Sequence, residues 1–204
     1  MRYSNVSRKK GTLMRLWPCL AALLFCLPRP GNAEPGWIAD SRSGCRVWNP
    51  DPGKNETITW SGDCKGGLAQ GKGSLQWFHD GRLIESDEGT WRDGKRTGHE
   101  IMTWGNGNHF EGEYRDGLPD GHGVLTRPDF SYDGEWRDGK KTGHGIQTWT
   151  NGARYEGGWR DNRPDGNGRL TQANGRTYDG TWNNGCFKDG NRRAAIGLDV
   201  SACP

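Results

Sequence analysis

Aromatic and charged residues alternate over short stretches of this 204-residue chain. In Tyr132-Asp-Gly-Glu-Trp136, the two aromatic residues and Gly134 take alternate positions, and two acids lie between them. Side chains of an extended chain alternate between its two faces, so the segment predicts a strand with one aromatic and one charged face. Asp138-Gly139 predicts a tight turn. A second strand is expected from 143 to 149, and Asn151-Gly152 then supplies the next turn.

This hairpin pattern recurs at a regular interval. The central glycines of the aromatic-acid segments are Gly89, Gly112, Gly134, Gly157 and Gly180, separated by 23, 22, 23 and 23 residues. Such a period indicates one supersecondary unit stacked on copies of itself. We therefore expect an all-β fold, a single elongated, twisted antiparallel sheet of stacked β-hairpin repeats with disulfide-stapled ends. The residues expected in its aromatic stack are Trp91, Phe110, Tyr114, Tyr132, Trp136, Tyr155, Trp159, Tyr178 and Trp182.

The composition fits a thin, aromatic core. Hydrophobic residues make up 31% of the chain, and there are 34 glycines, which excludes a thick aliphatic core. Disordered chains share this low hydrophobicity but are poor in aromatic residues, whereas this chain has 11 tryptophans. A glycine between two aromatic residues leaves room for a neighbouring ring to lie close to the backbone.

The first 33 residues differ from the repeats. They hold six Lys and Arg, no Asp or Glu, and a 12-residue apolar run over 16–27 that is too short to span a bilayer comfortably. With small residues at Gly31-Asn32-Ala33, this predicts a signal peptide cleaved near Ala33, and hence a periplasmic or secreted protein. The alternative is an uncleaved signal anchor. The mature chain would carry 28 − 6 = 22 basic against 25 acidic residues, a net charge of −3. Nucleic-acid binding, which needs a basic surface, then has no support.

Four cysteines would remain in the mature chain: Cys45, Cys64, Cys186 and Cys203. An even number in an exported chain favours disulfides, and three pairings are possible. Two cysteines precede the regular repeats and two follow them, which favours Cys45–Cys64 and Cys186–Cys203. Each bond would contribute roughly 3 kcal/mol on the loop-entropy model. Zinc is the competing interpretation, but the chain has no Cys-x-x-Cys pair.

Residues 60–188 resemble the MORN repeat family, whose unit reads close to Tyr-Glu-Gly-Glu-Trp-x-x-Gly-x-x-x-Gly-x-Gly. We count about six copies, of which the first, Trp60-Ser-Gly62-Asp-Cys64, and the last are degenerate. The expected organisation is a signal peptide (1–33), an N-terminal cap (34–59), the repeat array (60–188) and a C-terminal cap (189–204). Departures from the pattern are Cys64, Glu100, Phe130 and Asn162. The resemblance implies a scaffold, dimerisation or membrane-association module.

Candidate chemistry in the repeats has simpler explanations. His99, His122 and His144 share one repeat position, but equivalent residues two strands apart lie about 9–10 Å from each other, too far to share a metal ion. The acidic residues at the second position of each aromatic-acid segment lie equally far apart. Because their identical rows form no cleft, we do not expect a catalytic pair of carboxylates. The Arg-Asp pairs that begin each turn most simply form solvated cross-strand ladders. We therefore expect no enzyme activity, no metal and no cofactor.

The function expected from the sequence is a non-catalytic, exported scaffold for a protein partner or for self-association. One alternative is a cell-envelope glycan-binding module that uses exposed tryptophans of the second strand, Trp77, Trp104 and Trp149. A second alternative is association with membrane lipid, which the net charge of −3 opposes for anionic membranes.

Overall fold

The computed structural model describes residues 36–49 and 53–203. The predicted signal peptide, residues 1–33, lies outside the described residues. These described residues form one compact unit. In the part of the chain that the structure describes, no helix is long and apolar enough to cross a membrane.

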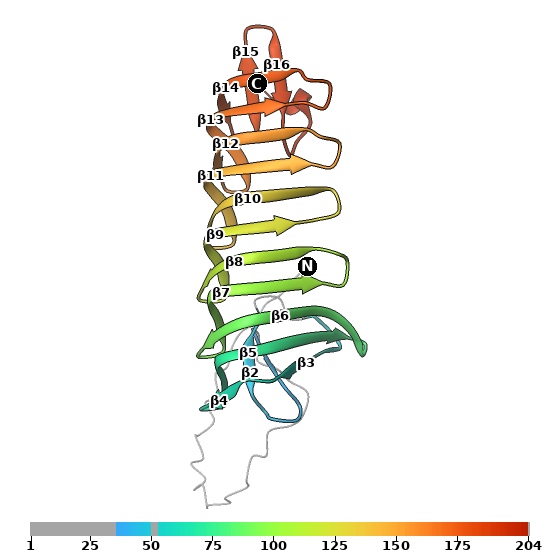
Figure 1. Cartoon of the computed structure of the whole chain (residues 1–204), viewed down its shortest axis with the longest axis vertical. Coiled ribbons are helices and arrows are strands. Elements are labelled where there is room, and N and C mark those ends of the chain that lie inside the picture. The colour runs from blue at the N-terminus through green and yellow to red at the C-terminus, as the bar shows by residue number, and fades with distance from the viewer. Residues whose placement is uncertain (1–35, 50–52, 204) are drawn as a thin grey trace, which may run out of the picture. The chain divides into compact units, whose positions relative to one another are not determined.

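Sixteen strands form one sheet, and they follow one another in chain order over most of it (Figure 1). A short 3-10 helix, η1 (Val200–Ala202), follows the last strand. The strands are β1 (Trp37–Ala39), β2 (Arg46–Trp48), β3 (Glu56–Trp60), β4 (Asp63–Lys65), β5 (Leu68–His79), β6 (Arg82–Arg92), β7 (Lys95–Trp104), β8 (His109–Arg115), β9 (Leu118–Thr126), β10 (Phe130–Arg137), β11 (Lys140–Trp149), β12 (Arg154–Arg160), β13 (Arg163–Thr171), β14 (Thr177–Asn183), β15 (Cys186–Asp189) and β16 (Arg192–Ala195).

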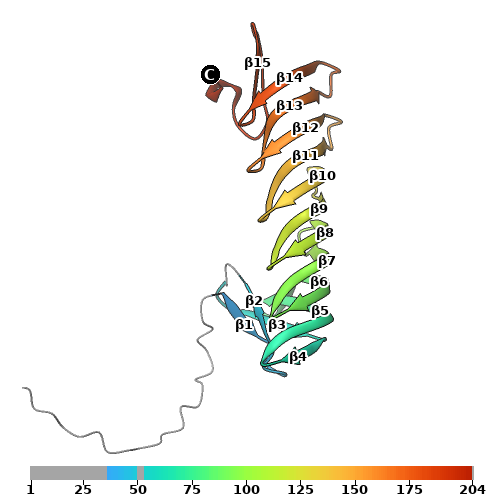
Figure 2. The ribbon, with the colours of Figure 1, turned by 90° about the vertical axis from the view of Figure 1, so that its left-hand side faces the viewer.

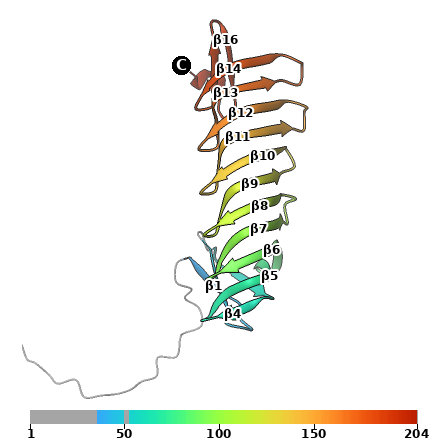
Figure 3. The ribbon, with the colours of Figure 1, turned by 60° about the vertical axis from the view of Figure 1, so that its left-hand side comes forward.

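The expected hairpin array is confirmed, and the strands from β5 to β16 pair antiparallel with their neighbours in sequence (Figure 3). The sheet is not wholly antiparallel, because β2 pairs parallel with β5 at Arg46 and Leu68. β3 and β4 also pair with β5, one after the other along its length. β1 contacts β3, and β2 lies between β1 and β5 in the sheet (Figure 2). The regular pairing therefore begins at the long hairpin β5–β6.

One face of the sheet carries the aromatic core. In β10, Tyr132, Gly134 and Trp136 are buried while Asp133 and Glu135 are exposed, as the alternation predicts. The nine aromatic residues expected in the stack are all buried. Rings of successive repeats meet edge to face, the geometry that aromatic pairs prefer. Tyr132, for example, lies 5.3 Å from Trp136 in its own strand and 5.2 Å from Trp159 in the next repeat, measured between ring centroids.

Glycines give these rings their space. The motif glycine of one strand pairs with a glycine of the next, as Gly134 does with Gly145. A Cβ atom on Gly145 would lie 2.4 Å from the hydroxyl oxygen of Tyr132, so no other residue fits there without a shift. The indole nitrogen of Trp159 donates to the carbonyl of Gly145 at 3.1 Å. Trp136 and Trp182 donate in the same way to Gly123 and Gly168, so this backbone carbonyl binds the tryptophan of the following repeat.

The Asp-Gly turns are two-residue turns with positive φ at both residues, as Asp138 (φ 48°) and Gly139 (φ 77°) show. The backbone N–H of the second turn residue donates to a carbonyl of the preceding repeat, so these hydrogen bonds connect successive turns. The N–H of Gly139 donates to the carbonyl of Pro119 at 2.9 Å, and that of Asn162 donates to Lys141 at 3.2 Å. Asn162 takes φ 69°, which asparagine tolerates better than most residues. The departure from glycine at 162 therefore leaves the turn intact.

The turns on the opposite side of the sheet are longer. After Trp149, the N–H of Gly152 donates to the Trp149 carbonyl at 2.9 Å, and Gly152 has φ 87°. Three residues, 150–152, thus separate the closing pair Trp149 and Ala153, an arrangement typical of a type I turn followed by a left-handed glycine. Phe130 departs from this pattern, because it directly closes a shorter loop by accepting from the N–H of Arg127 at 2.8 Å.

Both disulfides pair as the sequence favours. Cys45 bonds to Cys64 near the start of the sheet, and Cys186 bonds to Cys203 at its end. The N-terminal cap also covers turns of the array. Trp48 donates through its backbone N–H to the carbonyl of Gly94 at 2.7 Å, and its ring leaves no room for a Cβ atom at Gly117.

Candidate functional site

The aromatic stack is interrupted by a group of buried charged residues. Buried hydrophobic residues form two clusters, one ending at Trp91 and the other beginning at Met102. Between them, on β6 and β7, lie Asp87, Arg96 and Glu100, all buried. Asp87 stands at the position where the following repeats have Phe110, Tyr132, Tyr155 and Tyr178. We call Glu85, Asp87, Arg96 and Glu100 the polar cluster.

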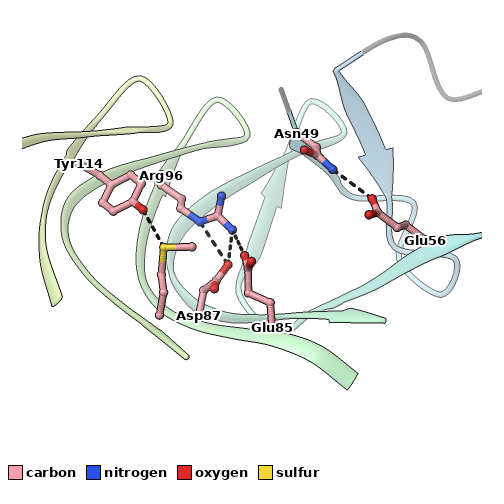
Figure 4. A network of polar contacts seen from close by, with 7 residues as sticks. Asn49, Glu56, Glu85, Asp87, Arg96 and Tyr114 are labelled. Carbon is pink, nitrogen blue, oxygen red and sulfur yellow. Dashed lines mark hydrogen bonds and ion pairs between the residues drawn. The ribbon is translucent and has the colours of Figure 1, made fainter. Parts of the chain in front are cut away.

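Arg96 holds two of the acids (Figure 4). Its guanidinium group donates to Asp87 through Nε at 3.2 Å and through Nη2, and to Glu85 at 2.8 Å. In the same network, the Tyr114 hydroxyl donates to the sulfur of Met102 at 2.8 Å (Figure 4). Burial raises the pKa of Glu85 to about 7. The cluster therefore combines a fully paired arginine with an acid that is easily protonated near neutral pH.

Glu100 fills the space over Gly89. A Cβ atom on Gly89 would lie 2.2 Å from the carboxyl carbon of Glu100, and Glu100 accepts a hydrogen bond from the N–H of Thr90 at 2.8 Å. Burial raises its pKa to about 8. Among the described residues, Asp87 Oδ1 and Glu100 Oε2 are buried without a hydrogen-bond partner, which costs stability. Asp87, Arg96 and Glu100 are buried, whereas Glu85 is partly exposed at the margin of the cluster.

The repeat two units further on has a cation in the same place. Lys141 corresponds to Arg96, and its ammonium group lies 4.4 Å from the ring centroid of Tyr132 and 5.0 Å from that of Trp159. It also donates to Gln147 at 2.6 Å. Burial lowers the pKa of Lys141 to about 8. A buried cation thus faces either carboxylates or aromatic rings, depending on the repeat.

The other face of the sheet carries paired, exposed charges. His122 lies 2.9 Å from Asp133, His99 lies 3.3 Å from Glu111, and Arg154 lies 2.7 Å from Glu156. Within 36–49 and 53–203, no three His, Cys, Asp or Glu side chains are placed to hold a metal ion. His99 and His122 instead face acids of the neighbouring strand, which is typical of cross-strand pairing.

The three tryptophans expected to be exposed differ in burial. Trp77 is only 5% exposed and belongs to the N-terminal core cluster, so the expectation of an exposed ring is wrong there. Ile58 of β3 pairs with Trp77 and belongs to the same buried cluster, so β3 extends the sheet and the core beside this ring. Trp104 and Trp149 are partly buried against the second cluster, and each lines a hollow at the edge of the sheet.

The hollow beside Trp104 collects exposed apolar side chains. It measures about 460 Å³ and lies where β6 begins. Leu83 is 50% exposed and Ile84 is 37% exposed, and both line it. Trp77 pairs with Glu85 while Phe78 pairs with Leu83, so Ile84 is the extra residue of a β-bulge. Bulges redirect side chains. Here the bulge puts two consecutive large residues at the surface.

Sequence reasoning missed Leu83 and Ile84, although one signal was available. The β5–β6 hairpin departs from the 23-residue period, and its turn, Asp80-Gly81, is an Asp-Gly turn on the side where most of the repeats have longer turns. Adjacent apolar residues directly after such a turn cannot both face the core of a regular strand. The polar cluster was likewise visible only as the departure at Glu100.

Comparison with known protein families agrees with this geometry. The model of the MORN repeat matches residues 88–109, 110–131, 132–154 and 155–175. No curated protein matches the chain. MORN repeats are in general protein-binding or membrane-associating modules and are usually non-catalytic. Residues 88–175 are four repeats of the MORN repeat family.

Proposed function

We propose that this protein is an exported, non-catalytic protein-binding module that associates with a second copy of itself through the hollow formed by Leu83, Ile84 and Trp104. The observation that carries the proposal is the exposure of Leu83 and Ile84 in one hollow. The described residues have four large hydrophobic side chains that are exposed, and these two adjoin. Contiguous exposed apolar surface on a soluble protein marks a site of interaction.

A second copy is the simplest partner for this surface. Most soluble oligomers are symmetric, and a two-fold interface uses the same surface patch on both subunits. In the described residues, β6 begins to pair with β7 only at Glu85, so Leu83 lies beyond the end of that pairing. Two such hairpin ends can meet without moving the rest of the sheet. The patch is small, so the expected affinity is in the micromolar range.

Export is supported by the cysteines. Two disulfides persist in oxidising compartments and are rare in the cytosol. Together with the signal-like composition of residues 1–33, they favour a periplasmic or secreted protein.

Disulfide trapping tests the interface. In the protein comprising residues 33–204, Ile84→Cys should form a covalent dimer on mild oxidation, because a two-fold interface brings the two copies of residue 84 together. Ile101→Cys is the matched control, since Ile101 is 36% exposed but lies in the middle of β7, outside the hollow. Equal trapping at both positions, or none at 84, would contradict the proposal.

A further inference from the structure

A second hollow, separate from the proposed interface, lies beside Trp149. It measures about 450 Å³ and is bounded by the turn after β11, the turn after β13 and the end of β16. Trp149, Asn151, Gln172 and Asn174 contribute to its wall. None of its ten lining residues carries an ionisable side chain, which is unusual in a chain with 26% charged residues.

Two of the amide side chains are held in the same way. The N–H of Ala153 donates to Asn151 Oδ1 at 2.9 Å, and the N–H of Arg176 donates to Asn174 Oδ1 at 3.0 Å. Each amide oxygen is therefore engaged by its own turn. The Nδ2 group of each asparagine, with two N–H donors, is the part that a ligand can use. Because the turns are equivalent in successive repeats, the hollow presents ordered donors.

The same hollow has an apolar part. Leu170 and Ile196 are buried lining residues, and Trp149 is partly buried against the aromatic core. Trp149 is therefore backed by packed side chains, and its position does not depend on a ligand. Ligand sites typically combine such an apolar surface with a few polar groups in fixed positions.

An apolar indole surface beside uncharged amide donors favours a particular class of ligand. A sugar ring has an apolar C–H face, which packs on an indole, and hydroxyl groups at its edge, which accept and donate hydrogen bonds. A charged ligand would meet no counter-charge among the lining residues. We propose that the hollow binds a neutral pyranose ring of an oligosaccharide, with Trp149 against the ring and with Asn151, Gln172 and Asn174 bonding its hydroxyl groups. The site is independent of the proposed dimer interface.

The hollow beside Trp104 is the internal comparison. Trp104 and Asn106 occupy the same turn positions as Trp149 and Asn151, and the N–H of Asn108 donates to Asn106 Oδ1 at 3.0 Å. Asn106 also lines that hollow, but Leu83, His79 and Arg82 line it where the Trp149 hollow has Gln172 and Asn174. Its tryptophan should therefore not bind a neutral sugar in the same way.

Isothermal titration calorimetry of residues 33–204 with cellotetraose, maltotetraose and N-acetylglucosamine tetramer tests the proposal. At least one probe should bind with a Kd below about 10 mM. The double variant Gln172→Glu, Asn174→Asp keeps an oxygen for the Arg176 N–H but replaces the amide donors with charge. It should weaken binding at least about tenfold, which corresponds to ~1.4 kcal/mol.

Asn106→Asp is the control, because it makes the same change in the equivalent turn beside Trp104 and should leave binding unchanged. Circular dichroism of the double variant checks that the sheet is intact. Failure of all three probes to bind, or binding that the double variant leaves unchanged, overturns the proposal. An equal loss with Asn106→Asp also overturns it, because the effect would then not belong to this hollow.

Discussion

The carboxyl group of Glu100 lies over Gly89 in the place that the hydroxyl group of Tyr132 takes over Gly134 two repeats later. Both groups bond to the residue after the glycine, but with opposite polarity. Glu100 accepts from the N–H of Thr90, whereas Tyr132 donates to the carbonyl of Glu135 at 3.1 Å. Asp87, which replaces the aromatic residue, and Glu100, which replaces a glycine, are thus two parts of one substitution in the core.

This relationship predicts strong coupling between positions 87 and 100. Asp87→Tyr alone should be severely destabilising, because its ring would meet the Glu100 side chain. Glu100→Gly alone leaves a void over Gly89 and should cost about 2–4 kcal/mol. The double variant restores the arrangement of Tyr132 over Gly145 and should recover most of that loss. Arg96 would then lie over the new ring as Lys141 lies over Tyr132.

Guanidinium denaturation of the four proteins gives the interaction free energy of this double-mutant cycle. We expect the coupling to exceed about 1 kcal/mol, well above the error for independent sites. Additive effects of the two substitutions would show that Glu100 does not take the place of the aromatic ring.

Stability should fall as the pH rises from 5 to 8. Burial raises the pKa of Glu85 to about 7 and that of Glu100 to about 8, above the ordinary value of 4.5. The folded state therefore binds more protons than the unfolded state in this range. The contribution is fully present below the unfolded pKa and is lost as the pH passes the folded values.

We expect a loss of several kcal/mol, at most roughly 6 kcal/mol for the two acids together, between pH 5 and pH 8 in the free energy of unfolding, measured with denaturant. Glu100→Gln keeps an oxygen for the Thr90 N–H but cannot ionise, so its profile should be flatter. Lys141 titrates with the opposite sign, because its folded pKa of about 8 is lowered, and it begins to contribute only at the upper end of the range. A profile that rises through pH 5–8 would contradict the assignment.

The glycines under the aromatic rings should not tolerate a methyl group. Gly145→Ala would place Cβ 2.4 Å from the Tyr132 hydroxyl and should cost about 1–3 kcal/mol. Gly105→Ala is the matched control. Its nearest neighbour would be the Leu83 carbonyl oxygen at 3.5 Å, and its backbone is not in the left-handed region. Thermal denaturation compares the two; an equal shift in Tm would show that the rings are not packed against glycine.

Each disulfide should stabilise one end of the sheet. The bonds join residues 19 and 17 positions apart, which gives about 3 kcal/mol each on the loop-entropy model. Cys203→Ser should therefore lower the unfolding free energy and raise amide hydrogen exchange in β15 and β16, while β9 and β10 keep their protection. Uniform loss of protection along the array would mean that the end does not act as a local cap.

The repeat pattern was enough to predict the fold. The alternation in Tyr132-Asp-Gly-Glu-Trp136 sets which face is buried, and Asp138-Gly139 sets the turn, because both depend only on local chain geometry. The burial of Trp77 was not predictable in this way. It depends on Ile58 in β3, a strand that precedes the regular repeats and pairs with β5.

The candidate surfaces were less predictable than the fold. Ile84 is exposed because of a bulge, and the adjacent apolar residues Leu83 and Ile84 show only that the regular alternation fails there, not which residue is the extra one. The Trp149 hollow depends on two turns and on β16, which lie more than 20 residues apart in the chain. Trp149 was singled out from its repeat position, and its role in binding stays a prediction.

The central claim, self-association through the Leu83–Ile84–Trp104 hollow, is tested most directly by sedimentation equilibrium over a range of concentrations around about 10 µM. The wild-type protein of residues 33–204 should behave as a monomer–dimer equilibrium. Leu83→Ser, Ile84→Ser should be monomeric, and Ile101→Ser, which removes an exposed residue elsewhere, should still dimerise. A wild-type protein that stays monomeric at about 100 µM, or a dimer that the double variant leaves unchanged, would contradict the account.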